Sequence, residues 1–182
     1  MTPSPSPHSL TPAMATRASP PPEARIQSLD AYWAFYLSEH REPASRALHF
    51  VGTSLFFGAV GASVVAHPVV FPAAMAVVVG LAWWASNHTE RTRPAFVALL
   101  AMIVVAAAAS PLYILGGVVA AYACAWVGHF RIEHNRPATF KYPVWSLLSD
   151  FRMWGEMVRG RLWRGDPLDE LGVRPPTDYD GA

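Results

Sequence analysis

The sequence is poor in cysteine and in charged side chains. Cys124 is the single cysteine among 182 residues, so neither an internal disulfide nor a CxxC zinc site can form. Only 15% of the residues are charged and 52% are hydrophobic, whereas about a quarter of a soluble domain is charged. A nucleic-acid-binding motif is also missing, and the cations adjoin apolar runs instead of forming a basic patch. The composition therefore argues against a nucleic-acid partner and favours a membrane protein.

The two ends of the chain differ in composition from its middle. Residues 1–27 consist mainly of Pro, Ser, Thr and Ala, which cannot bury enough apolar surface to order a segment. They also lack the apolar stretch of a signal peptide. Residues 165–182 are rich in Asp and Pro. We therefore expect a disordered tail over 1–27, one folded domain over 28–164, and a flexible tail over 165–182.

Four apolar runs fill the middle of the chain, over residues 47–66, 69–86, 95–109 and 112–128. A helix needs about 20 apolar residues to cross the hydrocarbon of a bilayer, within a range of about 17–25. The first, second and fourth runs meet this length, and the third is short enough to leave open whether it crosses fully. The sequence predicts an all-α integral membrane protein with a four-helix bundle.

The positions of the cations predict the orientation of this bundle. The chain has 14 Lys and Arg residues. They precede the first run, follow the last one, or lie in the loop 87–94, whereas the breaks at 67–68 and 110–111 have none. Because cytoplasmic loops are enriched in cations, both termini should be cytoplasmic. Lys141 is the only lysine, and a strong preference for Arg together with much Ala and Pro is typical of GC-rich bacterial genomes. We therefore expect a bacterial inner-membrane protein.

Residues 144–163 have the pattern of an amphipathic helix. Its apolar side chains return every three or four positions, at Trp145, Leu148, Phe151, Trp154, Met157, Val158 and Leu162. Polar side chains occupy the other face, at Ser149, Arg152, Glu156 and Arg159. Such a helix is too polar to span, so we expect it to lie on the cytoplasmic membrane interface. A helix packed on the domain as in a soluble protein is the alternative.

Ionisable residues cluster where the first and last apolar runs reach the cytoplasmic side. His129 and Glu133 are four residues apart, which places both on one face of a helix. Pro43 suits the first position of a helix, so His40 should lie in the elbow before that helix and His49 about two turns inside it. The topology then places His49 and His129 at a similar depth.

Histidine and carboxylate ligands without thiols suit Fe(II), with zinc as the rival metal. His88 lies in the loop on the same side of the membrane and is a candidate additional ligand. Two other classes of protein fit the same residues. His49 and His129 could clamp a haem in an electron-transfer protein, or the histidines could end helices in a non-catalytic membrane scaffold.

Two motifs resemble a known family. They are FYLSEHREPASRALHFVG over residues 35–52 and WVGHFRIEHNRPATFKYP over 126–143, followed by WSLLSDFRMW over 145–154. The chain resembles, over roughly residues 32–162, the small membrane 2-hydroxy fatty acid dioxygenases of phytosphingosine degradation. Three positions depart from the family pattern. His134 stands where lysine is common, Arg131 where an apolar residue is usual, and Ser45 where asparagine is frequent.

The resemblance implies an Fe(II)-dependent enzyme of lipid α-oxidation. A 2-hydroxy long-chain fatty acid would react with O₂ and lose its carboxyl carbon as CO₂, which leaves a fatty acid one carbon shorter. The residues that correspond to the family's metal ligands are His40, His49, His129 and Glu133. The carboxylate and hydroxyl of the substrate would bind the iron together, with the acyl chain among the transmembrane helices. Arg136 or Lys141 is the candidate partner of the substrate carboxylate.

Overall fold

The computed structural model describes residue 26 and the ranges 28–88 and 92–175, and within them it contains helices and loops but no strand. The elements are α1 (Leu29–Ser38), α2 (Pro43–Ala66), α3 (Val70–His88), α4 (Thr92–Ala109), α5 (Pro111–Val127), the π-helix η1 (Gly128–Glu133), the 3₁₀ helix η2 (Ala138–Phe140), α6 (Pro143–Val158) and α7 (Pro167–Leu171). The prediction of an all-α fold is confirmed.

The four apolar runs correspond to α2, α3, α4 and α5. Three helices are long and apolar enough to cross a membrane, over Pro43–Ala66, Val70–His88 and Pro111–Glu133. The third of these includes the π-helix η1, which continues α5 without a break. The fourth apolar helix, Arg93–Ala109, is shorter, as its run in the sequence predicts. Many side chains on these helices are large, apolar and exposed, which is the surface that lipid contact requires.

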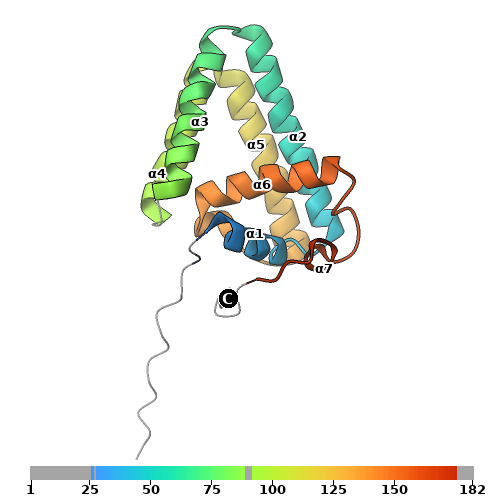
Figure 1. Cartoon of the computed structure of the whole chain (residues 1–182). Coiled ribbons are helices and arrows are strands. Elements are labelled where there is room, and N and C mark those ends of the chain that lie inside the picture. The colour runs from blue at the N-terminus through green and yellow to red at the C-terminus, as the bar shows by residue number, and fades with distance from the viewer. Residues whose placement is uncertain (1–25, 27, 89–91, 176–182) are drawn as a thin grey trace, which may run out of the picture.

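The apolar helices are arranged as two pairs. α2 packs along α5, and α3 packs along α4. The pairs are close together at the top of Figure 1 and spread apart toward its lower end. Gly117 permits the close contact of α5 with α2, because a Cβ atom there would lie 2.7 Å from the Cβ of Ala59. Small residues are commonly used in this way where membrane helices pack.

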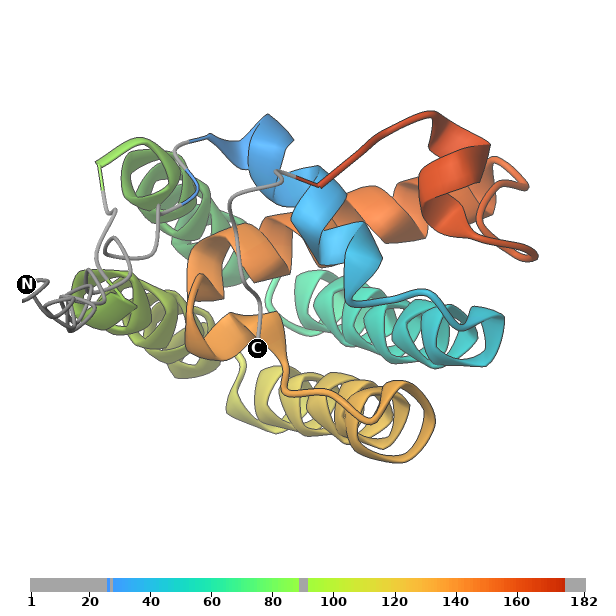
Figure 2. The same ribbon diagram turned by 90° about the horizontal axis from the view of Figure 1, so that it is seen from below.

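α6 lies across the spread lower ends of these helices (Figures 1 and 2). It contacts α1, α2, α3 and α4. Its own side chains Val144, Met153 and Met157 are buried. α6 thus packs on the domain, and its place at the membrane interface stays a prediction. The assignment of Ser149 to its polar outer face is wrong, because Ser149 is buried. The polar residues of α6 that line the cavity between the helix pairs are Ser146 and Asp150.

α1 covers α6 on the side away from the apolar helices (Figure 2). The two helices share a buried aromatic cluster, and the Tyr32 hydroxyl lies 2.6 Å from Ser146 Oγ. The chain after α6 returns to the same region. Buried Arg46 of α2 donates to the carbonyls of Leu162 and Gly165 at 2.7 and 2.8 Å, and α7 packs against α1. Residues 165–175 thus contain a packed helix within the predicted flexible tail. Residues 1–25, 27 and 176–182 of the predicted tails lie outside the described residues.

Candidate metal centre

Three histidines from separate elements meet at the lower end of the helix pair α2 and α5. His40 lies in the elbow between α1 and α2, His49 lies on α2, and His129 lies in η1. Their ring centres are 4.5, 4.7 and 5.2 Å apart. One nitrogen from each ring lies within 4.8 Å of the other two. All three side chains are buried.

The elbow that carries His40 follows from local sequence. Pro43 occupies the first turn of α2, where the missing N–H of proline costs no hydrogen bond. The chain reverses between Ser38 and Pro43, and the His40 ring stacks on Tyr36 with ring centres 4.1 Å apart. His40 therefore folds back over the end of α1 and reaches the two histidines of the membrane helices.

Every one of the three imidazoles has its Nδ1 engaged with an oxygen. Nδ1 of His40 lies 2.6 Å from the Tyr36 carbonyl, that of His49 lies 2.7 Å from Asp150 Oδ1, and that of His129 lies 2.7 Å from Asn135 Oδ1. A carbonyl oxygen only accepts, so Nδ1 of His40 carries the proton and its Nε2 has a free lone pair. Nε2 of His40 and of His49 is buried without a hydrogen-bond partner. Such atoms are costly to bury unless something else satisfies them, and a metal ion would do so.

The surroundings of the elbow keep the imidazole of His40 in its neutral form. Burial, together with the neighbouring imidazoles of His49 and His129, holds the pKa of His40 well below its usual value. The ring is therefore neutral near pH 7. A neutral imidazole is the form that binds a metal.

Asp150 of α6 was not among the residues that the sequence suggested. Its Oδ1 atom accepts from His49 Nδ1 and, at 2.5 Å, from the Tyr36 hydroxyl. Burial and the Asp150 carboxylate hold the pKa of Tyr36 well above its usual value, so the phenol keeps its proton and donates it. A carboxylate behind a histidine fixes the tautomer and raises the basicity of the metal-binding nitrogen. The signals in the sequence were one Asp within an aromatic amphipathic helix and its place in the segment WSLLSDFRMW, which shares the family resemblance.

Asn135 plays the same part for His129. Its Nδ2 atom donates to the carbonyl of Glu39 at 2.9 Å and to the Glu39 carboxylate at 3.0 Å. With its Nδ2 used in this way, the Asn135 amide presents Oδ1 to His129. His134, in the left-handed conformation with φ 55°, ends the helix and turns the chain so that Asn135 lies beside His129.

The other predicted ligand, Glu133, lies outside this cluster. The atoms within 4.8 Å of one another do not include its carboxylate. Glu133 Oε1 instead accepts from the backbone N–H of Glu42 at 3.0 Å. Glu42 is the N-cap of α2 and makes no side-chain capping bond of its own. Glu133 thus serves the end of a neighbouring helix, where a negative charge is favourable.

The remaining predicted site residues lie on the surface. Arg136 and Lys141 are exposed and do not belong to the wall of the cavity beside the histidines. Lys141 lies near Glu39, whose pKa is raised by burial and by Glu133, and the charge of Lys141 opposes that shift. His88 is exposed and stacks on Trp84, while its Nδ1 lies 2.9 Å from the Trp84 carbonyl. His134 is exposed as well.

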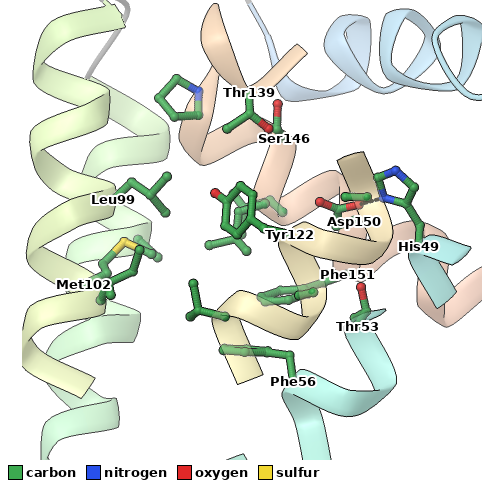
Figure 3. A pocket seen from close by; sticks show the side chains of 18 of the residues that line it. His49, Thr53, Phe56, Leu99, Met102, Tyr122, Thr139, Ser146, Asp150 and Phe151 are labelled. Atoms are coloured by element: carbon green, nitrogen blue, oxygen red, sulfur yellow. Dashed lines mark hydrogen bonds and ion pairs between the residues drawn. The ribbon is translucent and has the colours of Figure 1, made fainter. Parts of the chain in front are cut away.

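A cavity of about 540 Å³ lies between the two helix pairs and includes the three histidines in its wall. Its wall is mostly apolar, and residues from both pairs and from α6 contribute to it. Leu99 and Met102 of α4 lie opposite Tyr122, Phe151 and Phe56 (Figure 3). Asp150 belongs to the wall at the end near His49, and the dashed line in Figure 3 marks the bond between them. The histidine cluster therefore lies where a largely apolar space meets a polar end.

The chemistry of the cluster fits one small metal ion. Three imidazole nitrogens suit iron or zinc, and three protein ligands leave further positions open toward the cavity. A haem clamped between two of the histidines does not fit, because two imidazoles on opposite faces of one iron would have their ring centres about 6 Å apart. The ring centres of these histidines are closer, at 4.5–5.2 Å.

A family model agrees with these features. The model described as "2-hydroxy-palmitic acid dioxygenase Mpo1-like" matches residues 26–99 and 96–162. The match covers well over half of the chain, including all three histidines and Asp150. Neither a curated protein nor a solved structure matches the chain. The chain belongs to the Mpo1-like family.

Proposed function

We propose that this Mpo1-like protein is an Fe(II)-dependent dioxygenase that shortens 2-hydroxy long-chain fatty acids by one carbon. The observation that carries the proposal is the set of three buried histidines, each with its Nδ1 engaged. Two of them also have a buried Nε2 without a partner. A scaffold protein would have no use for these atoms, since leaving them unsatisfied destabilises the fold.

The metal ligands in this proposal are His40, His49 and His129. Glu133 was the fourth ligand expected from the sequence, and its hydrogen bond to Glu42 favours a structural role instead. The family's dioxygenase description favours Fe(II) over zinc, which has no redox chemistry. When bound, Fe(II) would supply positions for the oxygens of the substrate and for O₂, and the electrons that activate O₂.

The proposed reaction balances without a further cosubstrate. One 2-hydroxy acid and one O₂ give the fatty acid one carbon shorter, one CO₂ and one water. The bond between C1 and C2 breaks, C2 is oxidised to the new carboxyl group, and C1 leaves as CO₂. The protein's own part is to orient His49 through Asp150, to orient His129 through Asn135, and to keep water from the acyl chain with an apolar wall.

The proposed arrangement in the membrane places the metal centre at the cytoplasmic surface of a bacterial inner membrane. α2, α3, α4 and α5 would all cross, with both termini on the cytoplasmic side by the positive-inside rule. α6 and the segment after it would then lie at the interface, where Trp154 and Trp163 suit the headgroup region. α4 would cross as well. Its contacts to α3 and α5 would support it, and the bilayer can thin locally around a short helix.

The test is anaerobic purification in detergent with metal quantification, followed by addition of 2-hydroxypalmitate and O₂. We expect iron in the protein and release of pentadecanoate and CO₂ in equal amounts. His49→Ala and His129→Ala should lose both the iron and the product. His88→Ala is the matched control, because it removes an exposed histidine and should change neither.

Different results would refute different parts of the proposal. Bound zinc and no O₂ consumption would exclude a dioxygenase. A strong Soret band in the purified protein would restore the haem interpretation. Iron bound equally well by wild type and by both histidine variants would exclude this cluster as the metal site.

A further inference from the structure

The cavity beside the histidines extends deep between the helices as one continuous space. Its wall includes His129 at one end of α5 and Ile114 near the other. Between them, Val118, Ala121 and Ala125 belong to the same wall. They recur every three or four residues, so one face of α5 lines the cavity along its length.

The end of the cavity far from the histidines is closed by packed apolar side chains. Phe71, Ala106 and Ile114 form a buried cluster that joins α3, α4 and α5. Phe71 and Ile114 are 0% and 1% exposed. Val60 and Met75 pack against this cluster and also belong to the cavity wall. The cavity therefore has a floor.

The charges in the wall give the cavity a direction. Among the described residues that line it, Asp150 has the single carboxylate and none is a lysine or arginine. Polar and ionisable groups gather at the histidine end, whereas the floor is apolar. A ligand with one polar end and one long apolar tail would lie with its head at the histidines and its methyl end at the floor.

The length of the cavity sets how long that tail can be. His129 and Ile114 are 15 residues apart, which is about 22 Å along a helix at about 1.5 Å per residue. An extended alkyl chain advances about 1.3 Å per carbon, because its C–C bonds of about 1.5 Å zigzag. After the head group is placed at the histidines, the remaining length takes a chain of about 16 carbons.

We propose that the floor formed by Phe71, Ala106 and Ile114 acts as a ruler that selects the chain length of the 2-hydroxy acid. Val118 lies one turn above Ile114 on the same face of α5, about 6 Å nearer the histidines. A bulky side chain at position 118 would raise the floor by about four carbons. This inference rests on the proposed function for the identity of the head group.

Binding under anaerobic conditions tests the ruler without requiring turnover. Each methylene buried in the cavity strengthens binding about fourfold, and methylenes beyond the floor add nothing. Affinities of iron-loaded protein for 2-hydroxy acids of about ten to about twenty carbons should therefore rise and then level off near 16. In Val118→Phe the levelling should come about four carbons earlier. In Ile114→Ala it should come later.

A matched control lies next to the ruler residue. Val119 is 68% exposed and does not belong to the cavity wall, so Val119→Phe adds the same bulk outside the cavity and should leave the wild-type profile unchanged. Circular dichroism and gel filtration check that each variant is folded. If Val118→Phe does not fold, the opposite shift expected in Ile114→Ala still tests the proposal.

The outcomes separate the ruler from the proposed function. Wild-type affinity that keeps rising at every length, or an unchanged profile in both Val118→Phe and Ile114→Ala, would overturn the ruler. The tail would then leave sideways into the bilayer. A profile that Val119→Phe shifts as much as Val118→Phe would also overturn it. A levelling that shifts as expected, without turnover of any acid in O₂, would support the ruler and refute the dioxygenase.

Discussion

Replacement of Asp150 by asparagine tests whether the hydrogen bonds behind the histidines tune the metal centre. The Asp150 carboxylate accepts from His49 Nδ1 at 2.7 Å and from the Tyr36 hydroxyl at 2.5 Å. Asparagine keeps the shape of the side chain but removes its charge. The His49 imidazole then becomes less basic, and its tautomer is held less firmly.

The expected size of the effect follows from other metal sites with a carboxylate behind a histidine. Loss of such a partner weakens metal binding about 10- to 100-fold, which corresponds to about 1.4–2.8 kcal/mol. Tyr36→Phe removes one hydrogen bond from Asp150 but keeps the carboxylate, so its effect should be smaller. Asp30→Asn is the control, because the Asp30 side chain is 95% exposed and pairs with Arg152 on the surface.

The assay is an anaerobic titration of metal-free protein with Fe(II) against a competing chelator. We expect the order of affinity to be wild type equal to Asp30→Asn, then Tyr36→Phe, then Asp150→Asn. Unchanged affinity in Asp150→Asn would refute the reasoning that this carboxylate supports a metal ligand. Loss of affinity in Asp30→Asn as well would show a general effect of charge on the protein.

Three further predictions concern the surroundings of the site. Burial and the neighbouring Glu133 raise the pKa of Glu39, so its contribution to stability is present below its ordinary pKa and is lost as pH rises through the raised value. Glu39→Gln should therefore raise the midpoint of thermal unfolding at neutral pH and not at pH below about 4. Gly128→Ala should lower iron occupancy, because the new Cβ would lie 2.9 Å from Ser45 Oγ. Gly116→Ala, which meets nothing within 4 Å, should not lower it. Arg46→Met should destabilise the fold by about 3 kcal/mol in denaturant unfolding, because buried carbonyls lose a charged donor; unchanged stability would contradict its role in fixing the elbow.

The sequence was informative about the helices because hydropathy and helix signals are local. The apolar runs predicted α2, α3, α4 and α5, and the shortness of the run over 95–109 predicted the shorter helix there. Pro43 placed His40 in an elbow, and the structure has it there. The convergence of His40, His49 and His129 also followed from the predicted topology, which put the start of the first apolar helix and the end of the last at one end of the bundle.

The partners of those histidines could not be read from the sequence. The bond between His49 and Asp150 joins residues 101 positions apart, and it depends on how α6 lies across the helix ends. The i, i+4 spacing of His129 and Glu133 suggested a shared ligand role, but α2 offers an N-terminal N–H that binds the Glu133 carboxylate.

The sequence by itself thus determined which segments are apolar helices, where the first elbow lies, and which histidines come to one end of the apolar helices. The tertiary structure alone decided which oxygen fixes each imidazole, which predicted ligand serves a helix end instead, and how deep the cavity is. The physical reason is that hydropathy and helix capping act over a few residues, whereas these contacts depend on the packing of elements far apart in the chain.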